Sequence, residues 1–339
     1  MKHKLLAFII FAFIFGVIFV LKQEYFDKPF LDNDYEFYIS SNTSFEEVKN
    51  HIDSLCVDFP IIPKLGFGLF LKQKRLEYWF KPGRYIIKKT FSINDCVNKL
   101  RSQAQDPVNI TFNSMNHISP LFGIAGQKLE LDSIDLVHYI DSINLSLDSL
   151  TLLLIPNTYE VFWDISPKEF FDRIHFEYNA FWNSNRLEAA NKLNLSKQEV
   201  FVLASVIDKE ASHVDEMPRI AGLYLNRLKQ NWFLAADPTI IYAYEKIFNS
   251  SIRRVRNKHI DMTKSSSFNT YYHKGLPPFP ICIPSFQSLE SVLNPEEHKY
   301  MYMCARPDNS EYHNFATNYF QHQKNAAAFH KWLNKRKIF

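Results

Sequence analysis

Residues 196–211 have the sequence SKQEVFVLASVIDKEA, and this segment decides the fold around it. Its first four residues form a capping box, in which Ser196 and Glu199 bind each other's backbone N–H groups at a helix start. Hydrophobic residues then recur at spacings of three and four, which is typical of a helix with one apolar face. The segment therefore predicts a helix that packs into a core.

Glu210 lies near the C-terminal end of this predicted helix, on the border of its apolar face. A carboxylate beside apolar side chains is costly to ionise, so its pKa rises. Such a group holds its proton near neutral pH and donates it during catalysis. Glu210 is therefore the candidate catalytic acid and base. The alternative is a solvated carboxylate at the helix edge, or one arm of a salt bridge.

The N-terminus carries an unbroken apolar run, residues 5–21, with lysines on both sides. As a helix this run spans about 25 Å, the short end of what crosses a bilayer. No small-x-small cleavage site precedes Gln23, which favours an uncleaved anchor over a cleaved signal peptide. We expect residues 1–4 in the cytoplasm, a single-pass anchor in the cytoplasmic (inner) membrane, a linker at 22–34, and the rest on the outer, periplasmic side.

The composition argues against several other classes of protein. The net charge is only +3 and no long basic run is present, so nucleic acid is not an expected partner. The histidines and cysteines lack the spacing of metal ligands, so we expect neither a metal nor another cofactor. An oxidising compartment permits a disulfide between Cys56 and Cys96, but unpaired apolar thiols are the favoured interpretation.

Two regions with different patterns of predicted strands and helices follow the linker. Residues 35–102 show a strand and a helix, a middle stretch, and a second strand and helix, which is typical of a small binding module. Residues 103–339 mix both elements, with strands expected at 108–112 and 152–155 and a helix from Ser166. The expected fold class is α+β: an N-terminal transmembrane helix, a small β-α module, and a mixed α/β region with Glu210 on a helix.

Polar residues and prolines gather beyond this helix. Asp237 precedes Pro238 at a helix start, either as a plain N-cap or as part of a site. A proline-dense segment, residues 275–284, follows Asn269 and Tyr271. Such a segment is stiff, and asparagine amides pair with sugar hydroxyl and acetamido groups. The sequence favours a wall for an extended sugar chain, with a rigid surface connector as the alternative.

Four motifs occur in a fixed order: PNTY at 156–159, ASVIDKE at 204–210, NRL with LAADPTIIY at 226–242, and FNTY with GLPPFPICIP at 268–284. This order resembles that of the endolytic murein transglycosylases, the MltG or YceG-like family, over nearly the whole chain. Four departures occur: Asn157 replaces an acid, Asp208 a glutamate and Ser285 a glycine, and the family's late histidine motif is degraded at 313–323.

The resemblance implies a LysM-like glycan-binding subdomain at 35–102 and a catalytic region at 103–339 with its core at 151–323. It also implies cleavage of MurNAc–GlcNAc bonds within peptidoglycan glycan strands without water, leaving 1,6-anhydro-MurNAc ends, with Glu210 as acid and then base. The expected role is to end nascent strands, with peptidoglycan synthases as possible partners. The residues expected to bind substrate are Asn226, Asp237, Thr239, Asn269, Tyr271, Gly275, Pro277, Pro284 and Asn314.

Two alternatives to this function remain at the level of sequence. A muramidase differs only in using water as the acceptor and normally needs a second carboxylate. Asp208 is two positions from Glu210 on the helix and points away, so it is a poor second carboxylate. A non-catalytic scaffold that binds glycan and recruits wall-synthesis proteins is the other alternative.

Overall fold

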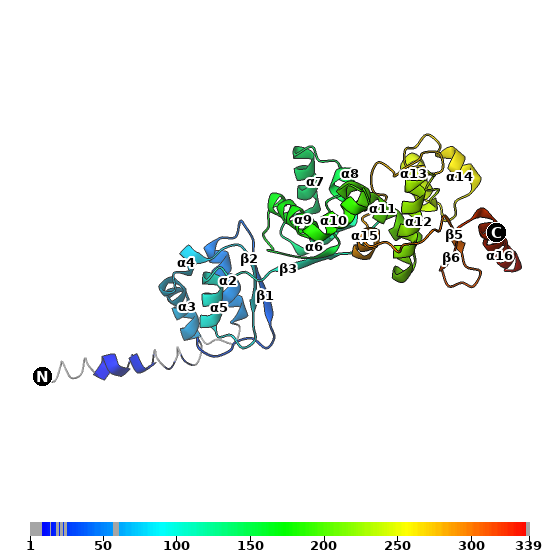
Figure 1. The fold of residues 1–339 in the computed structure, drawn as a ribbon. Helices are drawn as coiled ribbons and strands as arrows, with labels where there is room; N and C mark the ends of the chain where they lie inside the picture. The colour runs from blue at the N-terminus through cyan, green and yellow to red at the C-terminus, as the bar shows by residue number, and fades with distance from the viewer. Residues whose placement is uncertain are drawn as a thin grey trace. The chain divides into compact units, whose positions relative to one another are not determined.

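The computed structural model describes residues 9–13, 15–17, 20, 23, 26–56 and 61–336 (Figure 1). Much of the predicted anchor at 5–21 lies outside the described residues. Within those ranges, no helix is both long and apolar enough to cross a membrane. The chain divides into two compact units, and each has its own core. The first unit comprises residues 1–110, 125–132 and 159–166; the second comprises 111–124, 133–158 and 167–339.

The first unit is built on two antiparallel strands, β1 (Tyr35–Ile39) and β2 (Gly83–Ile87). Alternate side chains are buried, so Phe37 lies opposite Tyr85 on the core side while Glu36 and Arg84 lie on the other. The core is completed by α2 (Phe45–Leu55), α3 (Ile61–Gln73), α4 (Leu76–Trp79) and α5 (Ile93–Arg101). The strands and helices predicted for this module are confirmed.

The cysteines of the first unit are part of this core. Cys56 and Cys96 are both buried among apolar side chains, and Cys96 forms no disulfide. Burial raises the pKa of the Cys96 thiol to about 12, so it stays protonated and unreactive. The disulfide between Cys56 and Cys96 that an oxidising compartment permits is therefore not formed.

A second pair of strands, β3 (Val108–Phe112) and β4 (Asn157–Val161), follows in the chain. The strand predicted at 152–155 is wrong. The helix α8 (Leu147–Thr151) precedes this stretch, and the N–H groups of Leu152 and Leu153 bond back to carbonyl groups of that helix. Those donors are therefore used by the helix end, and the pairing strand starts only after Pro156.

The second unit is mainly helical. Its elements are α6 (Ser119–Lys128, whose last turn belongs to the first unit), α7 (Ser133–Ser142), α8, α9 (Pro167–Phe181), α10 (Ser184–Lys192), α11 (Lys197–Glu210), the 3₁₀ turn η1 (Val214–Glu216), α12 (Met217–Lys229), α13 (Asp237–Phe248), α14 (Asn257–Met262), α15 (Phe286–Leu293), β5 (Tyr302–Ala305), β6 (His313–Ala316) and α16 (Tyr319–Lys335). Strands β5 and β6 form an antiparallel hairpin.

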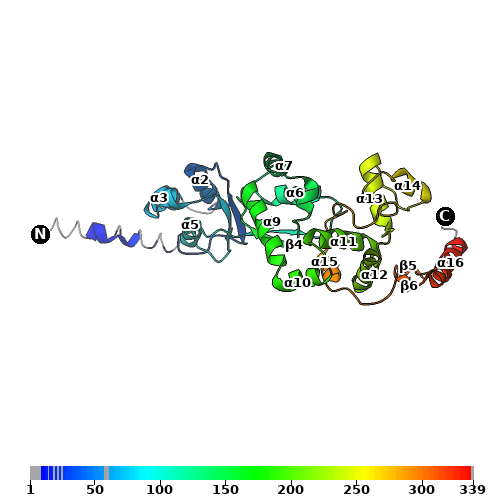
Figure 2. The same ribbon diagram turned by 45° about the horizontal axis from the view of Figure 1, so that its top comes forward.

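The helix α11 is the centre of the second unit. It starts with the predicted capping box at Ser196, and every residue from 200 to 207 is buried. It packs against α10, α12, α13 and α15, and Figure 2 shows it among its neighbours α10, α12 and α15. The helix ends at Glu210 because Ala211 is extended. The predicted helix is confirmed, and its buried body holds its last turn in a fixed position.

Candidate active site

Glu210 is the last residue of α11, and one of its carboxyl oxygens is buried. Its Oε2 atom has no hydrogen-bond partner among the described residues. Burial raises the pKa of Glu210 to about 7, because the ionised form loses its hydration. The negative end of the helix dipole also disfavours a carboxylate at this position. The group therefore exchanges its proton near neutral pH, as the sequence predicts for it.

Four other side chains act on this carboxyl group. Burial dominates, but the positive charges of His313 and Arg227 lower the pKa of Glu210, and the charge of Asp237 raises it. The Tyr224 hydroxyl lowers it as a nearby donor, although that hydroxyl has no hydrogen bond of normal geometry within the described ranges. The surroundings of Glu210 therefore act in both directions. The apolar surroundings favour the protonated acid, and the positive charges of His313 and Arg227 favour the carboxylate.

Asp237 and Tyr271 form a pair beside Glu210. The Tyr271 hydroxyl donates to Asp237 Oδ1 over 2.6 Å. Burial, and then the charge of Asp237, raise the pKa of Tyr271, so its hydroxyl stays protonated. Of the two interpretations of Asp237, the plain N-cap is wrong: Ala236 is the N-cap residue, and Asp237 is the first helical residue of α13. Its carboxylate is consequently free to bind Tyr271.

A second pair, His313 and Glu216, faces the site from the β5–β6 hairpin and η1. Glu216 is 2% exposed and accepts two bonds from His313, from the backbone N–H over 2.8 Å and from Nδ1 over 2.7 Å. Burial alone would lower the pKa of His313, but the hydrogen bond and charge of Glu216 raise it. These interactions favour the protonated, cationic form of His313 near Glu210. Asn314, a predicted site residue, is its neighbour in β6 and lies opposite Cys304.

Three other predicted substrate-binding residues hold the surrounding backbone in place. Asn226 donates to two carbonyl groups in residues 298–300. Thr239 is fully buried and donates to the backbone of Ala236. Asn269 is also fully buried; it donates to the backbone of α14 and accepts from the N–H groups that follow it. The contacts of Thr239 and Asn269 hold the backbone beside Asp237 and Tyr271, and the contacts of all three side chains leave them little capacity for a ligand.

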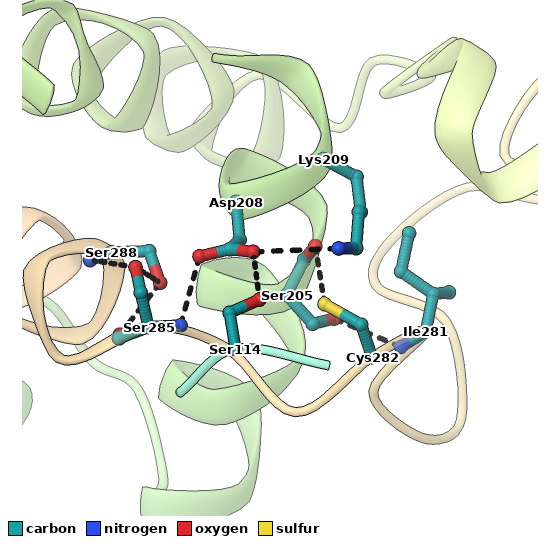
Figure 3. Close-up of polar contacts among 8 residues, drawn as sticks. All are labelled: Ser114, Ser205, Asp208, Lys209, Ile281, Cys282, Ser285 and Ser288. Carbon is teal, nitrogen blue, oxygen red and sulfur yellow. Dashed lines mark hydrogen bonds and ion pairs between the residues drawn. The ribbon is translucent and has the colours of Figure 1, made fainter. Parts of the chain in front are cut away.

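The proline-dense segment is fixed along one side of α11 (Figure 3). Asp208 accepts from the Ser114 hydroxyl over 2.5 Å and from the Ser285 N–H over 2.8 Å. One turn earlier, the Ser205 hydroxyl accepts from the Ile281 N–H over 3.0 Å. Asp208, whose position on the helix makes it a poor second catalytic carboxylate, therefore has a structural role.

This side of α11 is not the side of Glu210. Residues two apart on a helix point about 200° away from each other, so Asp208 and Glu210 face different surroundings. The segment begins with Gly275, which has a left-handed φ of +84°, and the buried Pro277. It ends with Pro284, next to the Ser285 N–H that Asp208 binds. No hydrogen bond within the described ranges joins the segment to Glu210.

Replacing Asp208 by alanine is expected to destabilise the second unit by about 2–3 kcal/mol, because the Ser285 N–H and the Ser114 hydroxyl both lose their acceptor. Chemical unfolding at neutral pH measures this. Asp208→Asn keeps one acceptor oxygen and serves as the matched variant, with a loss of about half that size. Equal stability of the alanine variant and the unsubstituted chain would contradict the assigned role.

Replacing Glu210 by glutamine is expected to stabilise the protein at alkaline pH. The folded-state pKa is about 7 against an ordinary value of 4.5, so the native state binds the proton more tightly than the unfolded chain. The cost of ionising the buried group is therefore absent below pH 4.5 and complete above 7, where it amounts to on the order of 3 kcal/mol. Melting temperatures from pH 4 to 9 test this. A glutamine variant that gains nothing at high pH would show that Glu210 is not held in an apolar environment.

The chain thus has one proton-exchanging carboxyl group at the end of a buried helix, surrounded by two cations, a carboxylate and two tyrosine hydroxyls. This arrangement is a candidate single-carboxylate acid–base site on a mixed α and β fold with small sheets. A family model described as YceG-like matches residues 37–328. The chain belongs to the YceG-like family.

Two curated relatives show similarity over shorter stretches. The endolytic murein transglycosylase of Bacillus subtilis (strain 168) is 33% identical over 115 residues, which is 34% of this chain and 30% of that protein. The protein of the same name from Streptococcus pneumoniae serotype 2 is 30% identical over 134 residues, 40% of this chain and 24% of that protein. The alignments therefore cover less than a third of each relative.

A solved structure resembles the fold as a whole. The crystal structure of a putative YceG-like protein from Listeria monocytogenes superposes with a TM-score of 0.52, at 19% sequence identity. The match covers 87% of this chain and 99% of that one. At this level of identity the likeness shows the fold alone.

Tyr224, Arg227, Glu216 and His313 were not predicted as site residues. Arg227 lies within the NRL motif and His313 directly precedes Asn314, so each was one position from a predicted residue. Tyr224 is spaced three residues from Arg227 on α12, and helical spacing could have placed both on one face. Glu216 carried no signal, because a glutamate in a short 3₁₀ turn has no distinctive pattern.

Proposed function

We propose that this chain is an endolytic lytic transglycosylase that cleaves MurNAc–GlcNAc bonds within peptidoglycan strands and leaves 1,6-anhydro-MurNAc ends. The observation that carries the proposal is the state of Glu210: a carboxyl group with one buried oxygen and a pKa of about 7. The names of the two bacterial relatives support the same reaction.

In the proposed reaction, protonated Glu210 donates to the oxygen of the glycosidic bond as that bond breaks. The resulting carboxylate then takes the proton of the C6 hydroxyl of the same MurNAc, whose oxygen closes on C1. The proton returns to Glu210, so no water is consumed and the enzyme is regenerated. His313 and Arg227 stabilise the carboxylate between the two steps, because their positive charges lower the pKa of Glu210.

One carboxylate suffices for this reaction, because the nucleophile belongs to the substrate and needs no separate binding step. A hydrolase would normally use a second carboxylate at about 5–9.5 Å. Asp208 is bound to Ser114 and Ser285, and Asp237 is bound to Tyr271, so neither is a free base. This division of roles favours the transglycosylase over a muramidase.

The first unit suits a glycan-binding module, the LysM-like role that the family resemblance implies. A hollow of about 720 Å³ lies on the strand face that points away from the core. Tyr38 and Trp163 form its aromatic wall, with ring centroids 5.1 Å apart, and Glu36 and Arg84 provide polar groups. Sugar rings pack their C–H faces on aromatic rings, and their hydroxyls bind such polar groups.

The location of the protein is part of the same proposal. The apolar run at 5–21 supports a single-pass anchor in the cytoplasmic membrane, with both units on its outer side. Peptidoglycan lies on that side, and a role in ending nascent strands beside the synthases fits an anchored enzyme. Fractionation of membranes, followed by protease access to intact spheroplasts, tests the orientation.

Digestion of purified, uncross-linked glycan strands tests the function. The expected products are strands of intermediate length with anhydro ends, identified by mass spectrometry. Reducing ends in their place would instead show a muramidase. Binding of the strands without any cleavage would show a scaffold.

A further inference from the structure

A charged pocket lies in the second unit, beside the last turn of α11. A cavity of about 560 Å³ and a smaller one of about 150 Å³ share the residues Asn116, His117, Tyr242, Glu245 and Ile281, so they adjoin and are treated together as one pocket. The smaller part is lined by Lys209 and Pro238. These residues precede Glu210 in α11 and follow Asp237 in α13, so the smaller part lies at the last turn of α11 and the first turn of α13, and neither Glu210 nor Asp237 lines it.

The walls of this pocket are held in place before any ligand binds. The segment that contains Asn116 is joined to Ile283 by backbone hydrogen bonds of 2.9 and 3.3 Å at Met115. Asp208 binds the same segment through Ser114 (Figure 3). A preformed pocket binds a ligand without the cost of ordering its own walls.

The pocket presents charges of both signs on an apolar floor. Lys246 Nζ lies 3.1 Å from an oxygen of Asp148, and His117 Nε2 lies 3.2 Å from Glu245 Oε1; all four side chains are 38–54% exposed. Burial alone would lower the pKa of Lys246, but its interactions with Tyr242 and Asp148 raise it, so the ammonium stays charged.

These pairs are open to exchange with a ligand. Exposed ion pairs contribute only about 0–1 kcal/mol, so replacing a partner by a ligand group costs little. Lys209 adds a further ammonium group at the end nearest Glu210, 3.7 Å from Asp208. Isoleucine and proline side chains line the floor between the charges.

We propose that this pocket binds the short peptide carried by the MurNAc sugar next to the cleaved bond. The inference rests on the proposed function. Neutral amides, hydroxyls and aromatic faces suffice to bind sugars, whereas paired charges around an apolar floor match a peptide that carries carboxylates, an amino group and small apolar side chains. Lys209 and Lys246 face the carboxylates, and Asp148 and Glu245 face the amine.

The test uses the Glu210→Gln form of the full chain, so that binding is measured without cleavage. Calorimetry compares glycan strands that carry their peptides with the same strands after the peptides are removed by an amidase. We expect peptide-bearing strands to bind at least about tenfold more tightly. In the same background, the Lys246→Met and Glu245→Gln double substitution is expected to abolish this preference and to leave the affinity for bare strands unchanged.

Lys264→Met is the matched control, because Lys264 is also an exposed ammonium over a tyrosine ring, 5.0 Å from the centroid of Tyr272, but it does not line the pocket. It should keep the full preference. Equal affinity for both kinds of strand, or a preference that survives the double substitution, would overturn the peptide pocket alone. Failure to bind either strand would overturn the proposed function together with it.

Discussion

Replacing Glu210 by glutamine is expected to lower the rate of anhydro-end formation by on the order of 10³-fold or more, while the protein stays folded. Glutamine has nearly the same shape but neither donates a proton to the leaving oxygen nor accepts one from the C6 hydroxyl. Both proton transfers are assigned to this one group, so a single substitution removes both. The loss therefore exceeds what removal of an acid alone would cause.

The measurement is the amount of anhydro-muropeptide released from purified sacculi per unit time. Circular dichroism and a melting curve confirm the fold of the variant. Asp208→Asn is the matched control, since Asp208 lies in the same turn but binds Ser114 and Ser285 instead of facing the site. It is expected to change stability far more than rate. Anhydro products from the Glu210→Gln variant at more than a few per cent of the normal rate would rule out the assignment.

Replacing Glu216 by alanine is expected to cost about 3–5 kcal/mol of unfolding free energy, because the largely buried His313 imidazole loses its charged partner. The effect depends on pH. The folded pKa of His313 is raised above its ordinary 6.5, so the stability that the pair contributes is complete below pH 6.5 and is lost as the pH rises through the folded value. Chemical unfolding at pH 6 and pH 9 should therefore show a larger loss at pH 6.

Asp215→Asn provides the control for this pair. Asp215 is the exposed neighbour of Glu216 and accepts from the Tyr312 hydroxyl of the same hairpin region. Its loss is expected to cost less than about 1 kcal/mol at either pH. If both substitutions cost the same, burial of the His313–Glu216 pair has no energetic role.

The milder Glu216→Gln variant separates stability from catalysis. It keeps an acceptor for the His313 backbone but removes the charge that holds the imidazole protonated. Glu210 then loses a positive neighbour, and its pKa rises while Arg227 and Asp237 still act on it. The alkaline limb of the rate profile, where Glu210 loses its proton, is expected to move upward by about one pH unit. If the alkaline limb does not move, the charge of His313 has no influence on the proton exchange of Glu210.

Much of the fold could be predicted because local signals and tertiary packing agree. The capping box predicted at Ser196 starts α11 in the structure, and the helices of the predicted first module, α2 and α5, also start with capping boxes, at Ser44 and Ser92. The error at 152–155 has the opposite cause. An apolar run of four residues fits a strand or the end of a buried helix equally well, and only the hydrogen bonds to the preceding turn decide between them.

The candidate site could be predicted only in part. Glu210 is visible in the sequence because its own helix supplies the apolar surroundings. His313 and Glu216 are 97 residues apart, and nothing local indicates that a hairpin brings them together. Asn269 and Thr239 stand within strong motifs, yet their buried side chains hold backbone. A sequence motif therefore indicates where the site lies, but it does not distinguish the residues that react from those that hold the backbone in place.

The most direct test of the single-carboxylate mechanism is digestion of glycan strands in water enriched in heavy oxygen, with mass spectrometry of the new MurNAc ends. The proposed reaction predicts no solvent oxygen in those ends, because the C6 oxygen of the sugar itself closes on C1. One heavy oxygen for each bond cleaved would contradict it and would show that Glu210 activates water instead.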